Sequence, residues 1–187
     1  MRKENRTPRT AKTVLSVVEG SPFGKNEYME KRYYAAYGSN LNVEQMRYRC
    51  PSARIIGTSV IRDYRLLFKG SKTGAYLTIE PRKGSVVPVG IWEVSEADEL
   101  ALDRYEGYPA FYYKAEMVLP ITGIRTGKVR ERKIFVYIMD ESRKIGVPTM
   151  RYFQTCAEGY SDFGFDRRIL VKAYYDSMED AYENGSK

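Results

Sequence analysis

The sequence predicts an α+β fold: a small mixed-sheet, barrel-like core flanked by helices. About six strand-like segments cluster in the middle of the 187-residue chain, and about four helical segments surround them. Regular alternation of strands with helices is missing, which disfavours a doubly wound parallel sheet. The length suits one domain with its own hydrophobic core.

Basic charge is concentrated at the N-terminus. Residues 1–12 carry five basic side chains and one acid, so they supply +4 of the formal net charge of +7. We expect residues 1–31 to form a basic, flexible leader, residues 32–178 the domain and residues 179–187 a frayed tail. Within the leader, the apolar piece Val14–Val18 is a candidate edge strand.

Several site classes are excluded or disfavoured by composition. The chain has no histidine, which excludes Ser-His and Cys-His nucleophilic machinery and His-ligated metals. Cys50 and Cys156 lack metal-site spacing, and we expect both to be buried free thiols. The sequence offers no site for a metal or an organic cofactor, and we predict neither. We also predict no membrane partner, since no apolar run reaches the roughly 18–20 residues of a membrane span. The thiols and the missing secretory h-region favour a cytoplasmic protein.

The first strand-like run, residues 32–37, is rich in aromatics and breaks at a glycine turn. A short helix is predicted from Val43 to Arg49, with Asn42 as its N-cap, Gln45 three residues on and Pro51 after its end. Backbone N–H groups of such a turn point into one space, where they can hold a carboxylate or carbonyl oxygen. From the residues alone, a binding loop and a plain connection are equally plausible.

The next segments read as strands. Residues 54–69 predict one long or bent strand, and residues 70–74 a turn. Residues 76–80 and 86–94 predict two further strands, separated by a turn at residues 81–84.

A well-marked helix begins after Ser95, its N-cap, and carries acidic residues in its first turn. Gly107 and Pro109 end it, which places Glu106 in the last turn. Its predicted apolar face comprises Ala97, Leu100, Ala101 and Tyr105.

Two strands and two helices complete the domain. The strands are predicted at residues 111–119 and 128–139, joined by a glycine-containing loop. One helix follows Thr149, and Asp166 caps the last. Their apolar positions are Phe153, Cys156, Ala157 and Tyr160 on the first, and Leu170, Ala173, Tyr174 and Met178 on the second.

Three blocks carry a resemblance. Tyr37-Gly38-Ser39-Asn40-Leu41 follows the first strand, Leu102-Asp103-Arg104-Tyr105-Glu106-Gly107 ends the marked helix, and Pro148–Tyr152 leads to Gly159-Tyr160. In this order they resemble the gamma-glutamylcyclotransferase-like (AIG2-like) family over most of the chain. The resemblance implies a closed or nearly closed barrel flanked by helices.

It also implies a reaction: the α-amine of a small γ-glutamyl compound attacks its own γ-carbonyl and releases 5-oxoproline. Glu106 matches the family's catalytic glutamate. A carboxyl at a helix C-terminus among aromatics should have a raised pKa, which suits general acid–base work. Asp103, three residues earlier, is a second acid that could raise this pKa further, but we expect it to make a structural hydrogen bond to the neighbouring turn.

The substrate-binding residues implied are Tyr37, Gly38, Ser39, Asn40 and Leu41, whose N–H groups are candidate oxyanion donors, together with Tyr113 and Tyr137. Ser39 is expected to donate a hydrogen bond rather than act as a nucleophile. Tyr137 is equally plausible as a plain strand residue.

Two other classes stay open from the sequence. One is a non-catalytic small-molecule-binding module that uses the same pocket. The other is a nucleic-acid-associated protein using the leader, which is disfavoured because basic and aromatic residues are not interleaved in one patch. Neither the leaving group nor the oligomeric state can be predicted.

Overall fold

The computed structural model describes residues 31–71 and 74–185. The predicted leader and its Val14–Val18 segment lie outside the described residues. Within the described part of the chain, no helix is both long enough and apolar enough to cross a bilayer.

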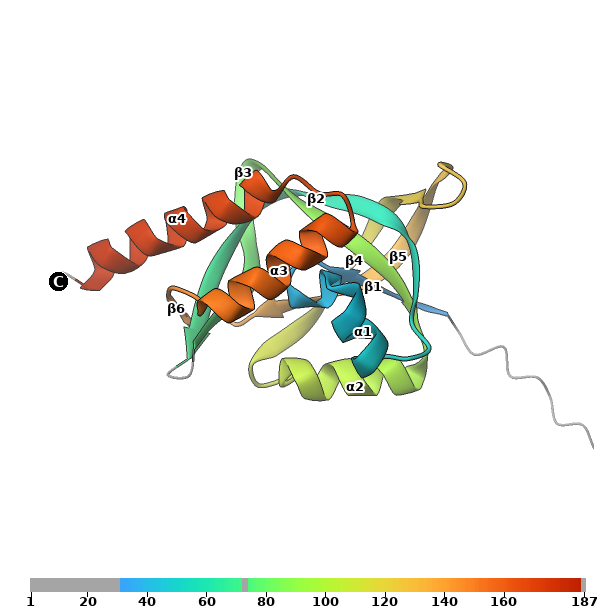
Figure 1. The fold of residues 1–187 in the computed structure, drawn as a ribbon, viewed down its shortest axis with the longest axis horizontal. Coiled ribbons are helices and arrows are strands. Elements are labelled where there is room, and N and C mark those ends of the chain that lie inside the picture. Colours follow the sequence, from blue (N-terminus) through green and yellow to red (C-terminus); the bar gives the residue numbers. More distant parts are fainter. Residues whose placement is uncertain (1–30, 72–73, 186–187) are drawn as a thin grey trace, which may run out of the picture.

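Five strands close into a barrel, with neighbours in the order β3-β1-β5-β4-β2 and β2 paired back to β3 (Figure 1). A short sixth strand pairs with β2. The strands are β1 (Arg32–Ala36), β2 (Arg54–Ser71), β3 (Gly74–Val94), β4 (Tyr112–Gly123), β5 (Val129–Met139) and β6 (Lys144–Ile145).

The sheet is mixed because β1 runs parallel to β5, with Tyr34 opposite Phe135, while the other described pairs are antiparallel. The predicted α+β class and barrel-like mixed sheet are therefore confirmed. Buried aromatics fill the interior; Tyr34 stacks on Phe135 at 5.4 Å between ring centroids and meets Tyr137 edge-on at 5.6 Å.

The turn predicted at residues 81–84 is wrong, because β3 continues through these residues. The register with β2 shifts there instead: Arg62 pairs with Val86, and Tyr64 pairs with Pro81. Asp63, at φ 59°, accepts a 2.8 Å hydrogen bond from the Gly84 N–H group. The polar segment is thus a bulge in a continuous strand, since pairing with β2 resumes on both sides.

Helices cover the barrel, with α3 across one face and α1 between α3 and α2 (Figure 1). They are the 3-10 helix η1 (Ser39–Leu41), α1 (Val43–Arg49), α2 (Glu96–Glu106), α3 (Met150–Asp162) and α4 (Arg167–Gly185). The last continues beyond residue 179, where the sequence predicts a tail. The expectation that Met178 faces the core is wrong, because its side chain is 40% exposed.

The predicted caps are confirmed. Asn42 accepts from the Gln45 N–H group at 2.9 Å. Thr149, which was not predicted as a cap, accepts from the Tyr152 N–H group at 3.3 Å. Asp166 accepts from Arg168 N–H at 2.9 Å. Ser95 caps α2 and forms a reciprocal capping box with Asp98.

The predicted apolar face of α2 is wrong. Leu100 and Tyr105 are exposed, whereas Asp98 and Leu102 are buried. Asp98 is drawn inward because its carboxylate accepts hydrogen bonds from Ser95 and Ser52. A polar residue therefore defines the buried face of this helix.

Helix α3 packs closely on the segment after β1. An added Cβ at Gly159 would lie 2.5 Å from the Asn42 backbone nitrogen and 2.6 Å from Leu41 Cβ. The buried free thiol of Cys156 is on the same helix, and that of Cys50 follows α1, as predicted. Glycine thus permits the contact that holds the post-β1 segment in place.

Substituting Gly159→Ala should lower the free energy of unfolding by about 1–3 kcal/mol, because the new methyl must displace backbone atoms. The expected loss is the net effect, after allowing for the roughly 1 kcal/mol by which alanine ordinarily stabilises a helix relative to glycine. Urea unfolding followed by circular dichroism measures it, with Arg151→Ala on the exposed side of α3 as control. A more stable Gly159→Ala protein would contradict the packing described.

Candidate active site

Helix α2 delivers Glu106 to one end of the barrel. Asp98, Leu102 and Glu106 are spaced four residues apart and lie on the inward-facing side of the helix. Gly107 ends the helix at φ 63°, and the Tyr108 N–H group donates to the Asp103 carbonyl at 3.0 Å. The carboxyl group of Glu106 is thereby fixed beside the segment that leaves β1.

That segment contributes Asn40, which is almost completely buried. Its Nδ2 group donates to Glu106 Oε1 at 2.7 Å and to the Tyr34 hydroxyl at 2.9 Å. Arg49, at the end of α1, donates to Asn40 Oδ1 and lies 3.3 Å above the Tyr105 ring centroid. Because Arg49 occupies the oxygen of the amide, the Asn40 nitrogen must face Glu106.

Glu106 lies where two hollows meet. The inner one is a recess of about 20 Å³, and the outer one is a cleft of about 490 Å³. Both are lined by Ser39, Glu106, Tyr112 and Tyr152. The recess admits about one water-sized group, whereas the cleft has the volume of a small-molecule site.

Tyrosine hydroxyls in the recess are tied to the fold. Tyr37 donates to the Tyr137 carbonyl at 2.6 Å, and Tyr112 donates to the Leu77 carbonyl at 2.8 Å. Tyr137 donates to Asp103 Oδ1 at 2.6 Å, and Asp103 also pairs with Lys114. The Asp103 side chain therefore ties α2 to the barrel strands, a structural role of the kind expected, while only its backbone carbonyl bonds the neighbouring turn, at Tyr108.

Burial raises the pKa of Glu106 to about 7, against the opposing effects of the Arg49 charge and the Asn40 hydrogen bond. The expected direction is confirmed, and desolvation is its cause. Burial also raises the pKa values of the tyrosines around it, so they stay protonated near neutrality; these are Tyr34, Tyr37, Tyr112, Tyr137 and Tyr152. Glu106 is thus positioned to exchange a proton at neutral pH.

The structure brings six of the sequence-predicted site residues to the recess: Tyr37, Gly38, Ser39, Asn40, Glu106 and Tyr137. Two predicted residues lie elsewhere. Leu41 is in the core, where its side chain approaches Gly90 and Gly159. Tyr113 points away and donates to Glu141 Oε1 at 2.8 Å.

The residue at the recess on β4 is Tyr112, which precedes Tyr113 and projects from the opposite face of the strand. Sequence reasoning also missed Tyr34, Leu77, Tyr152 and Arg49. Tyr34 lies in the aromatic run before the glycine turn, which was a usable signal. Leu77 carried none, since the closure of the barrel brings it there. Tyr152 lies in the third block of the resemblance but was assigned no role, and the packing of α3 brings it to the recess.

The glycine turn offers fewer free donors than expected. The Leu41 N–H group donates to the Gly38 carbonyl at 2.9 Å, and that of Asn42 donates to the Ser39 carbonyl at 3.1 Å. The N–H groups of Ser39 and Asn40 open η1 and have no acceptor within it. In the described part of the chain, no group of three or more Cys, Asp or Glu side chains could hold a metal ion.

Comparison with known proteins supports this picture. A model of the family described as "Gamma-glutamyl cyclotransferase, AIG2-like" matches residues 34–153, well over half of the chain. The chain belongs to this family. The match includes the glycine turn and Glu106 and ends within α3.

Curated relatives include a gamma-glutamylcyclotransferase from Bos taurus, 33% identical over 99 residues, which are 49% of this chain and 50% of the relative. The Homo sapiens protein of the same name is 33% identical over 91 residues, 45% of this chain and 48% of the relative. The chain spans about half the length of the curated relatives it matches.

Solved structures share the fold over a larger part of the chain. A gamma-glutamyl cyclotransferase superposes with a TM-score of 0.67 at 24% identity and covers 77% of this chain and 86% of its own. A Homo sapiens protein described as uncharacterized gives 0.66 at 26% identity, with the same coverage. The barrel with flanking helices is thus the fold of this family.

Substituting Glu106→Gln should stabilise the protein relative to wild type as pH rises. The folded-state pKa of about 7 lies above the ordinary 4.5, so the folded state holds this proton more tightly than the unfolded state. The protonated Glu106 carboxyl therefore contributes its full stabilisation below about pH 4.5, and this stabilisation is lost as pH rises through 7. The difference in unfolding free energy between variant and wild type should grow by on the order of 3 kcal/mol from about pH 5 to about pH 8.

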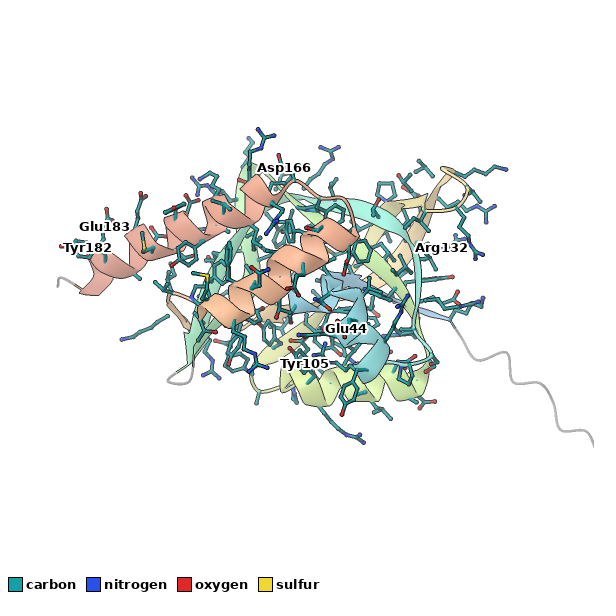
Figure 2. The ribbon with its side chains drawn as sticks, viewed as in Figure 1. Glu44, Tyr105, Arg132, Asp166, Tyr182 and Glu183 are labelled. Carbon is teal, nitrogen blue, oxygen red and sulfur yellow. The ribbon has the colours of Figure 1, made fainter. Side chains whose placement is uncertain are left out.

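Urea unfolding at several pH values measures this difference. Glu44→Gln, at an exposed position on α1, supplies the matched comparison (Figure 2). If the difference in unfolding free energy between Glu106→Gln and wild type stays constant with pH, the pKa of Glu106 is not raised in the folded protein.

Proposed function

We propose that this protein is a cyclotransferase that releases 5-oxoproline from a small γ-glutamyl compound, with Glu106 as the general acid and base. The observation that carries the proposal is the Glu106 carboxyl itself. It has a pKa of about 7, is held by Asn40 and lies where a recess meets a cleft of ligand size. Family membership supplies the reaction class.

The reaction needs one proton acceptor that becomes a donor. The α-amine nitrogen forms a bond to the γ-carbonyl carbon, and the carbonyl electron pair moves to oxygen. Glu106 takes the proton from the attacking nitrogen and then gives it to the departing nitrogen as the old carbon–nitrogen bond breaks. A carboxyl with a pKa near 7 performs both transfers at neutral pH.

The recess offers a place for the developing oxyanion. Its volume suits a single oxygen, and it is bordered by Gly38, Ser39 and Asn40. Of the turn residues 37–41 expected from the sequence to supply oxyanion donors, we retain the N–H groups of Ser39 and Asn40. Ser39 Oγ lies 3.1 Å from the Tyr105 hydroxyl and has no histidine to activate it. We therefore assign Ser39 to binding rather than to nucleophilic attack.

The outer cleft would hold the leaving group. Its walls are aromatic, with Tyr76 and Phe111 packed edge-to-face at 6.2 Å between centroids. Arg104 and Arg143 line its polar side. Guanidinium groups suit a carboxylate, so the cleft favours γ-glutamyl amino acids over neutral γ-glutamylamines.

Substituting Glu106→Gln should lower 5-oxoproline release by on the order of 100-fold or more, because glutamine keeps the size and cannot carry the proton. Release is measured over a panel of γ-glutamyl amino acids, γ-glutamylamines and glutathione, with Glu44→Gln as control. Equal rates in Glu106→Gln and wild type would remove Glu106 from the mechanism. Ligand binding without turnover across the panel would instead identify a binding module.

Substituting Arg49→Met should move the acidic limb of the kcat/KM profile toward higher pH. The Arg49 charge lowers the pKa of Glu106, and its removal leaves the effect of burial opposed only by the Asn40 hydrogen bond. Arg47→Met, at an exposed position on the same helix, is the matched control. A lower kcat at every pH with an unshifted profile would mean that Arg49 only supports the fold.

A further inference from the structure

The turn between β5 and β6 brings Arg143 to the wall of the outer cleft. The Arg143 guanidinium lies 4.7 Å from the Phe111 ring centroid and donates a 3.3 Å hydrogen bond to the Ala110 carbonyl. Both contacts are made to the segment between α2 and β4, and neither of them neutralises the guanidinium charge. Because a guanidinium carries five N–H donors, Arg143 retains donors for a ligand in the cleft.

The turn that carries Arg143 is closed by local hydrogen bonds. The Arg143 N–H group donates to the Asp140 carbonyl at 3.1 Å, and Asp140 Oδ1 accepts from the Ser142 N–H group at 2.9 Å. Bonds of this kind give a turn its shape. They do not fix the place of the turn against the barrel, which depends on contacts from other elements.

Glu141, inside this turn, is held from two strands of the barrel. Tyr113 of β4 donates its hydroxyl proton to Glu141 Oε1 at 2.8 Å. Lys69 of β2 donates from Nζ to the Glu141 carbonyl at 2.7 Å. After the turn, β6 pairs with β2 as well. Both side-chain bonds therefore act two residues before Arg143, on the part of the turn that faces the barrel.

Lys69 is a buried lysine that the proposed chemistry does not use. Its side chain is only 6% exposed, and its ammonium group pairs with Glu80 on β3. Withdrawing an ammonium group from water is costly, and an apolar side chain at this place would avoid that cost. An apolar side chain could not supply the hydrogen bond to the Glu141 carbonyl. Glu80 thus compensates the charge, while another donor of the same group is directed to the turn.

We propose that Lys69 and Tyr113 are positioning residues for Arg143. By holding Glu141 from two strands, they keep the turn where the Arg143 guanidinium faces the cleft and binds a carboxylate on the leaving group. The inference rests on the proposed function and goes beyond it, because it makes substrate selection depend on two residues outside both hollows. It also gives Tyr113, expected from the sequence to bind substrate, an indirect part in substrate binding.

Two compounds that differ only in the carboxylate of the leaving group provide the readout. γ-Glutamyl-alanine releases alanine, and γ-glutamyl-ethylamine releases the same skeleton without its carboxylate. The ratio of their kcat/KM values reports recognition of that carboxylate, because effects on Glu106 and on the γ-glutamyl half are common to both compounds. Arg143→Met should lower this ratio by about tenfold or more, since hydrogen bonds to a charged group are lost.

Lys69→Met should lower the same ratio by about threefold or more, because Arg143 remains but is less often in place. The kcat/KM value for γ-glutamyl-ethylamine should stay within about twofold of wild type, since this compound has no carboxylate for Arg143. Lys83→Met, at an exposed position on β3, is the matched control and should leave both values unchanged.

Circular dichroism checks that each variant is folded. Tyr113→Phe removes one hydroxyl group and leaves the ion pair between Lys69 and Glu80 intact. It should lower the ratio in the same direction as Lys69→Met, and it decides the question if Lys69→Met does not fold.

A double-mutant cycle separates positioning from a general effect on the fold. If Lys69 acts through Arg143, the ratio in Lys69→Met/Arg143→Met should equal the ratio in Arg143→Met alone. Three results would overturn the proposal: an unchanged ratio in the folded positioning variants, an equal loss with both compounds, or a double variant whose ratio falls by the product of the two single effects.

Failure of the proposed function would give a different result. A wild type that releases 5-oxoproline from neither compound would contradict the proposed function. The ratio of the dissociation constants of the two compounds, measured by calorimetry, then takes the place of the kcat/KM ratio. The same variants and the same control test the positioning roles in either case.

Discussion

The 2.7 Å hydrogen bond from Asn40 to Glu106 joins the segment after β1 to the end of α2, 66 residues later. Withdrawing a carboxyl from water is costly, so the fold must supply polar partners in compensation. Asn40 can serve only because Arg49 occupies its oxygen and Tyr34 shares its nitrogen. The caps of α1 and α2 and the close approach at Gly159 all hold this one contact in place.

The partners around Glu106 leave its charge incompletely compensated. One amide donor and one nearby guanidinium oppose desolvation without cancelling it, and the pKa settles about 7. A direct ion pair to the same carboxyl would stabilise its charged form and bring the pKa down. A fold selected only for stability would favour that solution, whereas proton transfer at neutral pH favours the one present.

Local chemistry made much of this structure predictable. Caps at Asn42, Ser95 and Asp166 depend on a few adjacent residues, and all three were read from the sequence. The face of a strand or helix depends on distant partners, and there prediction failed: Tyr112 rather than Tyr113 lines the recess. The inward face of α2 was missed because a buried Asp98, bonded to Ser52 and Ser95, outweighed apolar periodicity.

Hydrogen bonds within the fold divide the tyrosines of the recess into two groups, those that donate their hydroxyl proton and those that accept. The hydroxyl groups of Tyr37, Tyr112 and Tyr137 each donate their single proton to a backbone carbonyl or a carboxylate of the protein. Their oxygens can still accept hydrogen bonds, but they have no proton left to donate. Tyr34 and Tyr152 differ, because Tyr34 accepts from Asn40 and Tyr152 accepts from the Leu77 N–H group, and these bonds leave the hydroxyl protons free to be donated. An oxygen atom placed in the recess would therefore find donors in Tyr34, Tyr152 and the N–H groups of Ser39 and Asn40, and only acceptors in the other three tyrosines.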